Sequence, residues 1–163
     1  MAKIAIGKKV PAFRAPATNG TVIASKDLVG EPFVLYFYPR DDTPGCTLEG
    51  EAFRDHHAEF RKLKVRVLGV SRDSLAAHEK FKAKFKFPFE LISDPDEKLC
   101  GTFDVIRDKN MYGKKVRGIE RSTFLFDANG TLRREWRKVT VKGHAEAVLD
   151  AAAALRGECC SDP

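Results

Sequence analysis

The feature that most constrains the fold is a continuous apolar run at residues 32–38, Pro-Phe-Val-Leu-Tyr-Phe-Tyr, which ends at Pro39. A run of this length without polar alternation is typical of a strand whose two faces are both covered. Helices must supply that cover, because strands alternate here with segments of helical spacing. We therefore expect an α/β fold with a mixed central sheet flanked by helices on both faces. The further strands are predicted at 65–71, 89–92, 122–126 and 131–137, and the helices at 43–62, 74–86, 95–103 and 143–156.

The two ends of the chain add a hairpin and a tail. The turn pair Asn19-Gly20 precedes a short β-branched segment and predicts the second arm of an N-terminal hairpin. The chain has 163 residues and shows no internal repeat and no linker, which favours a single domain. We place this domain at residues 1–157. Residues 158–163 are polar and are expected to form an exposed C-terminal tail.

Composition excludes several classes of protein. Hydrophobic residues make up 43% of the chain, which is too high for a disordered protein. The longest apolar run is far shorter than the roughly 20 residues that a membrane helix needs. The first residues lack the apolar core of a secretory signal, and four cysteines are too few for a disulfide scaffold. We expect a cytoplasmic protein whose thiols are reduced or redox-active.

The chain is basic, with 29 Lys and Arg against 23 Asp and Glu, which gives a net charge of +6. Basic chains attract nucleic acid and acidic surfaces. Here, however, the charges alternate with apolar residues at 61–66 and 133–138, a pattern typical of solvated faces. We therefore predict no nucleic-acid partner. The densest basic stretch, residues 107–117, is interpreted either as a solvent-facing loop or as a docking surface.

Cys46 is the main candidate for chemistry. It follows the buried strand, lies in a loop rich in Pro, Gly and Asp, and opens a predicted helix with Thr43 as its N-cap and Pro44 as its first residue. Amides at a helix N-terminus favour a thiolate, which is the nucleophile in cysteine chemistry. A small buried cysteine is the alternative interpretation. The loop position favours the reactive one, because loops lie at the surface.

A family resemblance becomes specific at this point. Pro39, Thr43 and Cys46 match the Pro-x-x-x-Thr-x-x-Cys motif of peroxiredoxins. The whole segment 37–49 resembles the bacterioferritin comigratory protein, or peroxiredoxin Q, subfamily, and so do the segments 93–96 and 118–124. The resemblance covers nearly the whole chain. It implies a thioredoxin-like fold with an N-terminal β-hairpin extension. It also implies thiol-dependent reduction of hydrogen peroxide and organic hydroperoxides, an antioxidant role in redox homeostasis.

The resemblance implies roles for four residues in catalysis. Cys46 would be the peroxidatic cysteine and would become a sulfenic acid. The Thr43 hydroxyl would donate to the sulfur and to the substrate oxygen, besides capping the helix. Arg121 would place a positive charge beside the sulfur, favouring the thiolate and stabilising the leaving oxygen. Pro39 would shield the sulfur and shape the pocket.

Two more residues are expected to support this site. Glu49 would anchor the active-site arginine or the loop, although a glutamate on the helix surface is an equally good interpretation. The backbone amides of Gly45 and Cys46 can bind a peroxide oxygen, as helix N-termini bind anions. No metal or cofactor is expected, since the reaction needs none and the sequence holds no Cys-x-x-Cys or His-x-x-x-His pair.

The sequence departs from the family in how the sulfenic acid is resolved. Many relatives carry a resolving cysteine five residues after the first, where this chain has Glu51, and others carry it on the next helix, which has none here. Three routes stay open. An external thiol can attack Cys46 directly, the tail pair Cys159 and Cys160 can fold back, or Cys100 can resolve, although a buried structural thiol is its default interpretation. Gly50 is expected to weaken the helix one turn after Cys46 and to ease its unwinding.

The leading hypothesis is thus a cysteine peroxidase that uses thioredoxin, glutaredoxin or a small thiol as reductant. We expect a monomer, or at most a weak dimer, with no membrane partner. A thiol–disulfide oxidoreductase without peroxidase activity is the alternative. That chemistry normally uses Cys-x-x-Cys, and residues 45–49 offer no second sulfur. A basic nucleic-acid-binding module is a third hypothesis, disfavoured by the interleaved charges.

Overall fold

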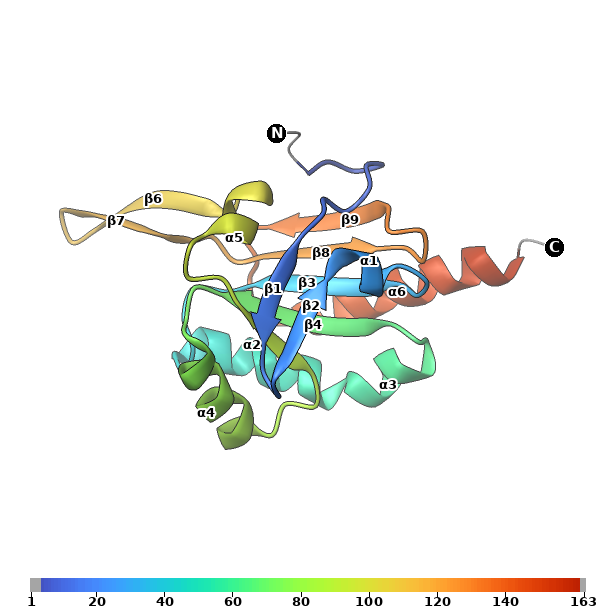
Figure 1. Ribbon diagram of the computed structural model, residues 1–163, viewed down its shortest axis with the longest axis horizontal. Helices are drawn as coiled ribbons and strands as arrows, with labels where there is room; N and C mark the ends of the chain where they lie inside the picture. Colours follow the sequence, from blue (N-terminus) through green and yellow to red (C-terminus); the bar gives the residue numbers. More distant parts are fainter. Residues whose placement is uncertain (1–3, 162–163) are drawn as a thin grey trace.

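The structure, a computed structural model, describes residues 4–161, with the side chains at 109, 111 and 157–161 excepted. Strands and helices alternate along most of the chain (Figure 1). Their order is β1 (Arg14–Ala17), β2 (Thr21–Ala24), α1 (Ser25–Leu28), β3 (Phe33–Phe37), α2 (Pro44–Asp55), α3 (His57–Lys62), β4 (Arg66–Ser71), α4 (Leu75–Phe85), β5 (Glu90–Ser93), α5 (Lys98–Thr102), β6 (Ile106–Met111), β7 (Lys114–Ile119), β8 (Ser122–Phe126), β9 (Leu132–Arg137) and α6 (His144–Ser161).

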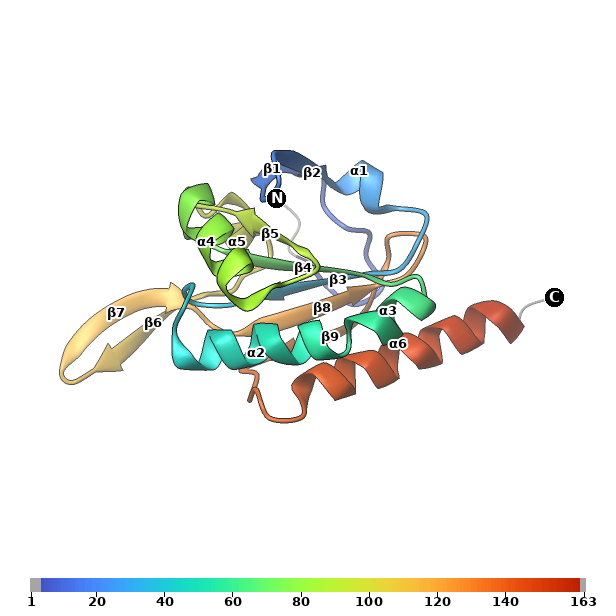
Figure 2. The ribbon, with the colours of Figure 1, turned by 90° about the horizontal axis from the view of Figure 1, so that it is seen from below.

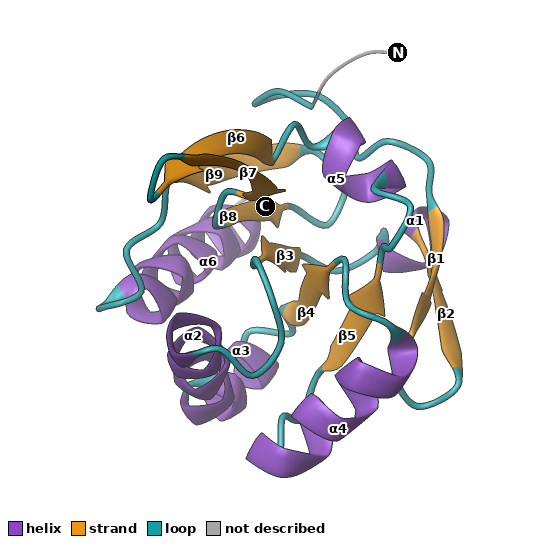
Figure 3. Cartoon of the chain, turned by 90° about the vertical axis from the view of Figure 1, so that its left-hand side faces the viewer, coloured by secondary structure: helices purple, strands orange, loops and turns teal. Residues whose placement is uncertain are grey.

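The central sheet has seven strands in the order β2-β1-β5-β4-β3-β8-β9. Strand β3 pairs parallel with β4 and antiparallel with β8, so the sheet is mixed, as predicted. The predicted N-terminal hairpin is formed by β1 and β2, which extend the sheet beyond β5. Figure 3 shows helices on both sides of the sheet, which confirms the expected α/β architecture.

Strand β3 explains why its sequence is apolar throughout. Alternate side chains of a strand point to opposite faces. Phe33, Leu35 and Phe37 pack into one core, with α1 and α5. Val34 and Tyr36 pack into the other core, with α2, α3, α4 and α6. All five residues are at most 1% exposed, so both faces of β3 are covered.

Three elements differ from the sequence-based expectation. The helix predicted over 43–62 is two helices, because the backbone at His56 leaves helical geometry with φ −97° and ψ 4°. The basic stretch 107–117 lies in a hairpin of β6 and β7 that projects from the body (Figures 1 and 2). Tyr112 and Gly113 at its tip both have positive φ, as a two-residue hairpin turn of type I′ requires. Helix α6 runs to Ser161, beyond the predicted end at 156.

Among residues 4–161, no helix combines the length and apolar character needed to cross a bilayer.

Candidate active site

Cys46 lies in the first turn of α2, directly beyond the end of the central strand β3. Pro44 is the first residue of the helix and Thr43 occupies its N-cap position, as the sequence predicted. The Cys46 side chain is buried, with 2% of its surface exposed, in the core between α2, α6 and the sheet. Its sulfur is a free thiol. The fold therefore places a buried thiol where unpaired backbone amides of a helix begin.

Arg121 reaches this thiol from the connection between β7 and β8. Its Nη2 lies 3.5 Å from Cys46 Sγ, and its Nη1 donates a hydrogen bond of 2.6 Å to Glu49 Oε1. The Arg121 carbonyl accepts a hydrogen bond of 3.0 Å from the Val139 amide, which holds the backbone in place. Three residues singled out in the sequence, Cys46, Glu49 and Arg121, therefore meet at one point.

Glu49 is not on the helix surface. Its side chain is 1% exposed and forms an ion pair with Arg121. Burial raises the pKa of Glu49 to about 7, although the nearby Arg121 charge opposes this rise. Burial lowers the pKa of Arg121, but the Glu49 carboxylate and the Cys46 sulfur raise it by more. The net shift of the Arg121 pKa is therefore upward. The guanidinium is thus held as a cation beside the sulfur.

Thr43 differs from its predicted role as a side-chain cap. Its hydroxyl donates a hydrogen bond of 2.9 Å to the Arg40 carbonyl and makes no capping bond to the helix. The side chain turns back toward the loop, so the amides of Gly45 and Cys46 in the first turn receive no hydrogen bond from it. The Thr43 carbonyl still accepts the hydrogen bond of the Thr47 amide, at 2.8 Å.

Gly45 and Pro39 shape the space around Arg121. A Cβ atom at position 45 would lie 3.0 Å from Arg121 Nη2, so glycine leaves room for the guanidinium. Pro39 and Arg121 line a cleft of about 330 Å³, together with Glu120, Lys138 and Val139. The cleft opens beside the guanidinium group that contacts the sulfur.

Of the remaining cysteines, Cys100 lies apart from this site, and the side chains of the other two are outside the described part of the structure. Cys100 belongs to α5 and is fully buried in the core on the opposite face of the sheet. Burial, with the Asp94 carboxylate, raises the pKa of the Cys100 thiol well above its usual value. Cys159 and Cys160 belong to the last turns of α6, and their side chains are outside the described residues.

His144 is a neighbour of the site that sequence reasoning missed. Its Nε2 lies 2.7 Å from Thr123 Oγ1, and only 6% of the residue is exposed. Burial lowers the pKa of His144 to about 4, and the positive charge of Arg121 adds to this effect. The imidazole is therefore neutral near pH 7. No local signal could have shown this, because the contact joins the first residue of α6 to a strand 21 residues earlier in the chain.

Comparison with known proteins places these residues in a family context. Residues 6–135 match a family model described as the AhpC/TSA family. Peroxiredoxin Bcp of Xanthomonas campestris is 54% identical over 134 residues, which are 82% of this chain and 84% of that protein. A putative peroxiredoxin bcp of Coxiella burnetii is 47% identical over 146 residues, 90% of this chain and 97% of that protein.

Solved structures agree in fold. The bacterioferritin comigratory protein of Xanthomonas campestris, whose structure was used to study its alkyl peroxide reduction activity, matches with a TM-score of 0.84 and 50% identity. The match covers 88% of this chain and 92% of that one. A cysteine-to-serine mutant of PrxQ from Xylella fastidiosa matches with a TM-score of 0.89 and 41% identity, over 94% of this chain and 98% of that one.

Proposed function

The chain belongs to the AhpC/TSA family and is a peroxiredoxin, a thiol peroxidase, and we propose that Cys46 is the residue at which it reduces peroxides. The observation that carries this proposal is the 3.5 Å contact between Cys46 Sγ and Arg121 Nη2, made in the first turn of α2. A guanidinium carries its charge at every physiological pH, and helix N-terminal amides add a partial positive charge. Both stabilise the thiolate form of Cys46, which is the nucleophile.

The reaction transfers one oxygen atom to sulfur. The Cys46 thiolate attacks one oxygen of the hydroperoxide, so that an S–O bond forms while the O–O bond breaks. The sulfur loses two electrons and becomes a sulfenic acid. The second oxygen leaves as hydroxide or alkoxide and takes up a proton to become water or an alcohol. Arg121 stabilises the negative charge that develops on this leaving oxygen.

The residues around the sulfur support this step in distinct ways. In the proposal, the Thr43 hydroxyl gives up the Arg40 carbonyl for the peroxide oxygen when substrate binds. The amides of Gly45 and Cys46 bind the same oxygen, because the first amides of a helix have no partner within it. Glu49 holds Arg121 in place. Pro39 forms one wall of the cleft through which the peroxide approaches.

We further propose that an external thiol regenerates Cys46. Glu51 stands five residues after Cys46, and α4 contains no cysteine. Cys100 is a poor resolver, since it lies in the core on the other face of the sheet. The reductant would be thioredoxin, glutaredoxin or a small thiol of the cytoplasm, acting on a monomer or weak dimer. The tail pair, Cys159 and Cys160, is the second route.

The test is to treat the reduced protein with one equivalent of hydrogen peroxide and to map the products by peptide mass spectrometry, with and without a sulfenic-acid trap. The expected result is a trapped sulfenic acid on Cys46 and no disulfide when the trap is omitted. The Cys46→Ser variant should consume no peroxide. A disulfide from Cys46 to Cys159 or Cys160 would instead identify the tail as the resolver. An unreactive Cys46 would contradict the assignment of the peroxidatic residue.

A further inference from the structure

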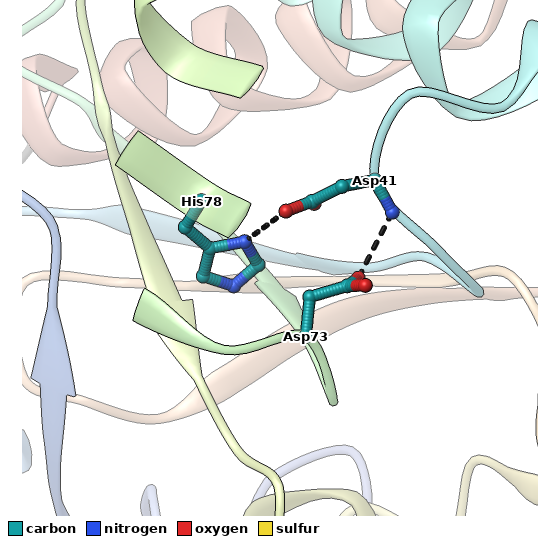
Figure 4. Close-up of side chains that lie close together, drawn as sticks. All are labelled: Asp41, Asp73 and His78. Carbon is teal, nitrogen blue, oxygen red and sulfur yellow. Dashed lines mark hydrogen bonds and ion pairs between the residues drawn. The ribbon is translucent and has the colours of Figure 1, made fainter. Parts of the chain in front are cut away.

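Three side chains behind the active-site loop form a compact polar cluster (Figure 4). Asp41 comes from the loop between β3 and α2, Asp73 from the turn between β4 and α4, and His78 from α4. His78 is completely buried, and the Asp41 side chain is 6% exposed. A buried ionisable pair of this kind is costly unless its polar atoms are satisfied. The hydrogen-bond partners of His78 and Asp41 therefore determine whether this pair is stable.

Every polar atom of the His78 ring is used. Its Nε2 lies 2.9 Å from the Ile92 carbonyl oxygen, which can only accept, so Nε2 carries a hydrogen. Its Nδ1 lies 2.6 Å from Asp41 Oδ2, and one proton lies between these two atoms. The other oxygen of Asp41, Oδ1, accepts the hydroxyl of Tyr38 at 2.6 Å. Both ring nitrogens of His78 and both carboxylate oxygens of Asp41 therefore have partners within the protein.

The same network holds the backbone of the loop. The Asp41 amide donates a hydrogen bond of 2.9 Å to Asp73 Oδ2, and that oxygen also accepts the Ser71 hydroxyl at 2.5 Å. Asp41 is thus fixed at its side chain by α4 and at its amide by the turn before α4. The following residue, Asp42, has a φ of 57°, a left-handed conformation that is unfavourable for a residue with a side chain. Helix α2 and Cys46 follow directly.

We propose that His78 is a positioning residue of the peroxidase reaction, which holds Asp41 through its Nδ1 and thereby sets where the loop ends and the Cys46 helix begins. The inference rests on the proposed role of Cys46. His78 touches neither the sulfur nor the substrate. It acts through Asp41, and a shift of about 1 Å in the reacting groups is enough to slow a reaction by roughly a hundredfold.

A pair of variants separates this role from simple filling of the core. In His78→Asn the amide nitrogen can occupy the place of Nδ1 and still donate to Asp41. In His78→Gln it can occupy the place of Nε2, so the bond to Ile92 is kept and the bond to Asp41 is lost. Both variants bury one neutral amide. We expect the second-order rate constant for Cys46 oxidation by hydrogen peroxide to fall at least about tenfold in His78→Gln and to stay within about threefold of wild type in His78→Asn.

The control is a second contact between α4 and the loop that precedes α2. Lys84 of α4 forms an exposed ion pair of 2.9 Å with Asp42, and exposed pairs contribute little. The Lys84→Ala variant should therefore keep the wild-type rate. Equal rates in His78→Asn and His78→Gln, or a loss in Lys84→Ala as large as in His78→Gln, would overturn the proposal.

A spectroscopic measurement on the wild-type protein does not depend on any variant folding. NMR of the wild-type protein should show the Nε2 hydrogen of His78 and the proton shared by Nδ1 and Asp41 as two signals protected from exchange with water, and the Asp41→Asn variant should change the second signal. The absence of a protected signal for the proton shared by Nδ1 and Asp41 would contradict the inference. Oxidation of wild-type Cys46 in the same rate assay tests the proposed function separately, so that the two failures are distinguishable.

Discussion

At the scale of single residues, the site depends on the planar fork of Arg121. One of its nitrogens bonds Glu49 and the other faces the Cys46 sulfur. A lysine has a single ammonium group and cannot make both contacts with the same geometry. A lysine at position 121 would therefore separate the effect of a positive charge from the effect of where that charge is placed.

The first prediction concerns this fork. Arg121→Gln should slow the oxidation of Cys46 by peroxide by roughly a hundredfold, because the leaving oxygen loses its charged partner. Arg121→Lys should fall between this variant and wild type. Stopped-flow mixing with hydrogen peroxide gives the rate constants, and Arg66→Gln, which removes an exposed arginine from β4, is the matched control. A wild-type rate in Arg121→Lys would show that placement is unimportant.

His144 makes a prediction about stability and pH. Its pKa is lowered from 6.5 to about 4 in the folded protein, so the unfolded chain binds a proton that the folded one does not between these values. The contribution to the free energy of unfolding is therefore present above pH 6.5 and is lost as the pH falls toward 4. From pH 7 to pH 5 we expect a loss of about 2 kcal/mol.

Urea unfolding of wild type and His144→Gln at both pH values measures this contribution. The glutamine amide can still bond Thr123, but it does not titrate. The free energy of unfolding of wild type minus that of His144→Gln should therefore be smaller at pH 5 than at pH 7. Glu49 acts in the opposite sense, because its pKa is raised to about 7 and its contribution falls as the pH rises through that value. This effect is common to both proteins and cancels in the difference, and a constant difference would refute the assignment of His144.

At the scale of elements, α2 shows where sequence reasoning reached its limit. Its start was predictable, because Thr43 and Pro44 are local signals for a helix N-terminus. Its end at Asp55 was not, because the helical spacing continues through His56 into α3. Gly50 was expected to loosen the helix. The structure gives a packing reason for this glycine, since an added Cβ would lie within 3.0 Å of two carbon atoms of the Phe87 ring.

A glycine substitution tests the packing. Gly50→Ala should lower the free energy of unfolding by about 1–3 kcal/mol, because overpacking outweighs the gain in helix propensity. Gly50→Ala combined with Phe87→Leu should recover part of the loss. The matched control is Gly101→Ala in α5, where a Cβ has nothing within 4 Å and should leave stability unchanged or raise it by up to ~1 kcal/mol. Chemical denaturation measures all three, and equal effects at positions 50 and 101 would argue against the packing explanation.

At the scale of the whole molecule, the sheet separates two cores, and only one of them contains the sulfur of Cys46. The α/β architecture was predictable because apolar runs and helical spacings are local properties of the sequence. The meeting of Cys46 with Arg121 was not, since 75 residues separate them and only the family resemblance linked them. The contacts of His144 with Thr123 and of His78 with Asp41 arise from tertiary packing alone. No spacing rule would have found them.

The hairpin of β6 and β7 is a suitable site for attaching a label or a tether. Its strands pair with each other and, in the described part of the chain, with no other strand, so the central sheet does not depend on its tip. Tyr112 at the tip is fully exposed, while the base of the hairpin leads within two residues to Arg121. A dye, or a tether to a solid support, placed at Tyr112 would leave the cleft beside Pro39 open. The enzyme can thus be immobilised or labelled at the tip of a projecting hairpin whose base lies two residues from Arg121 (Figures 1 and 2).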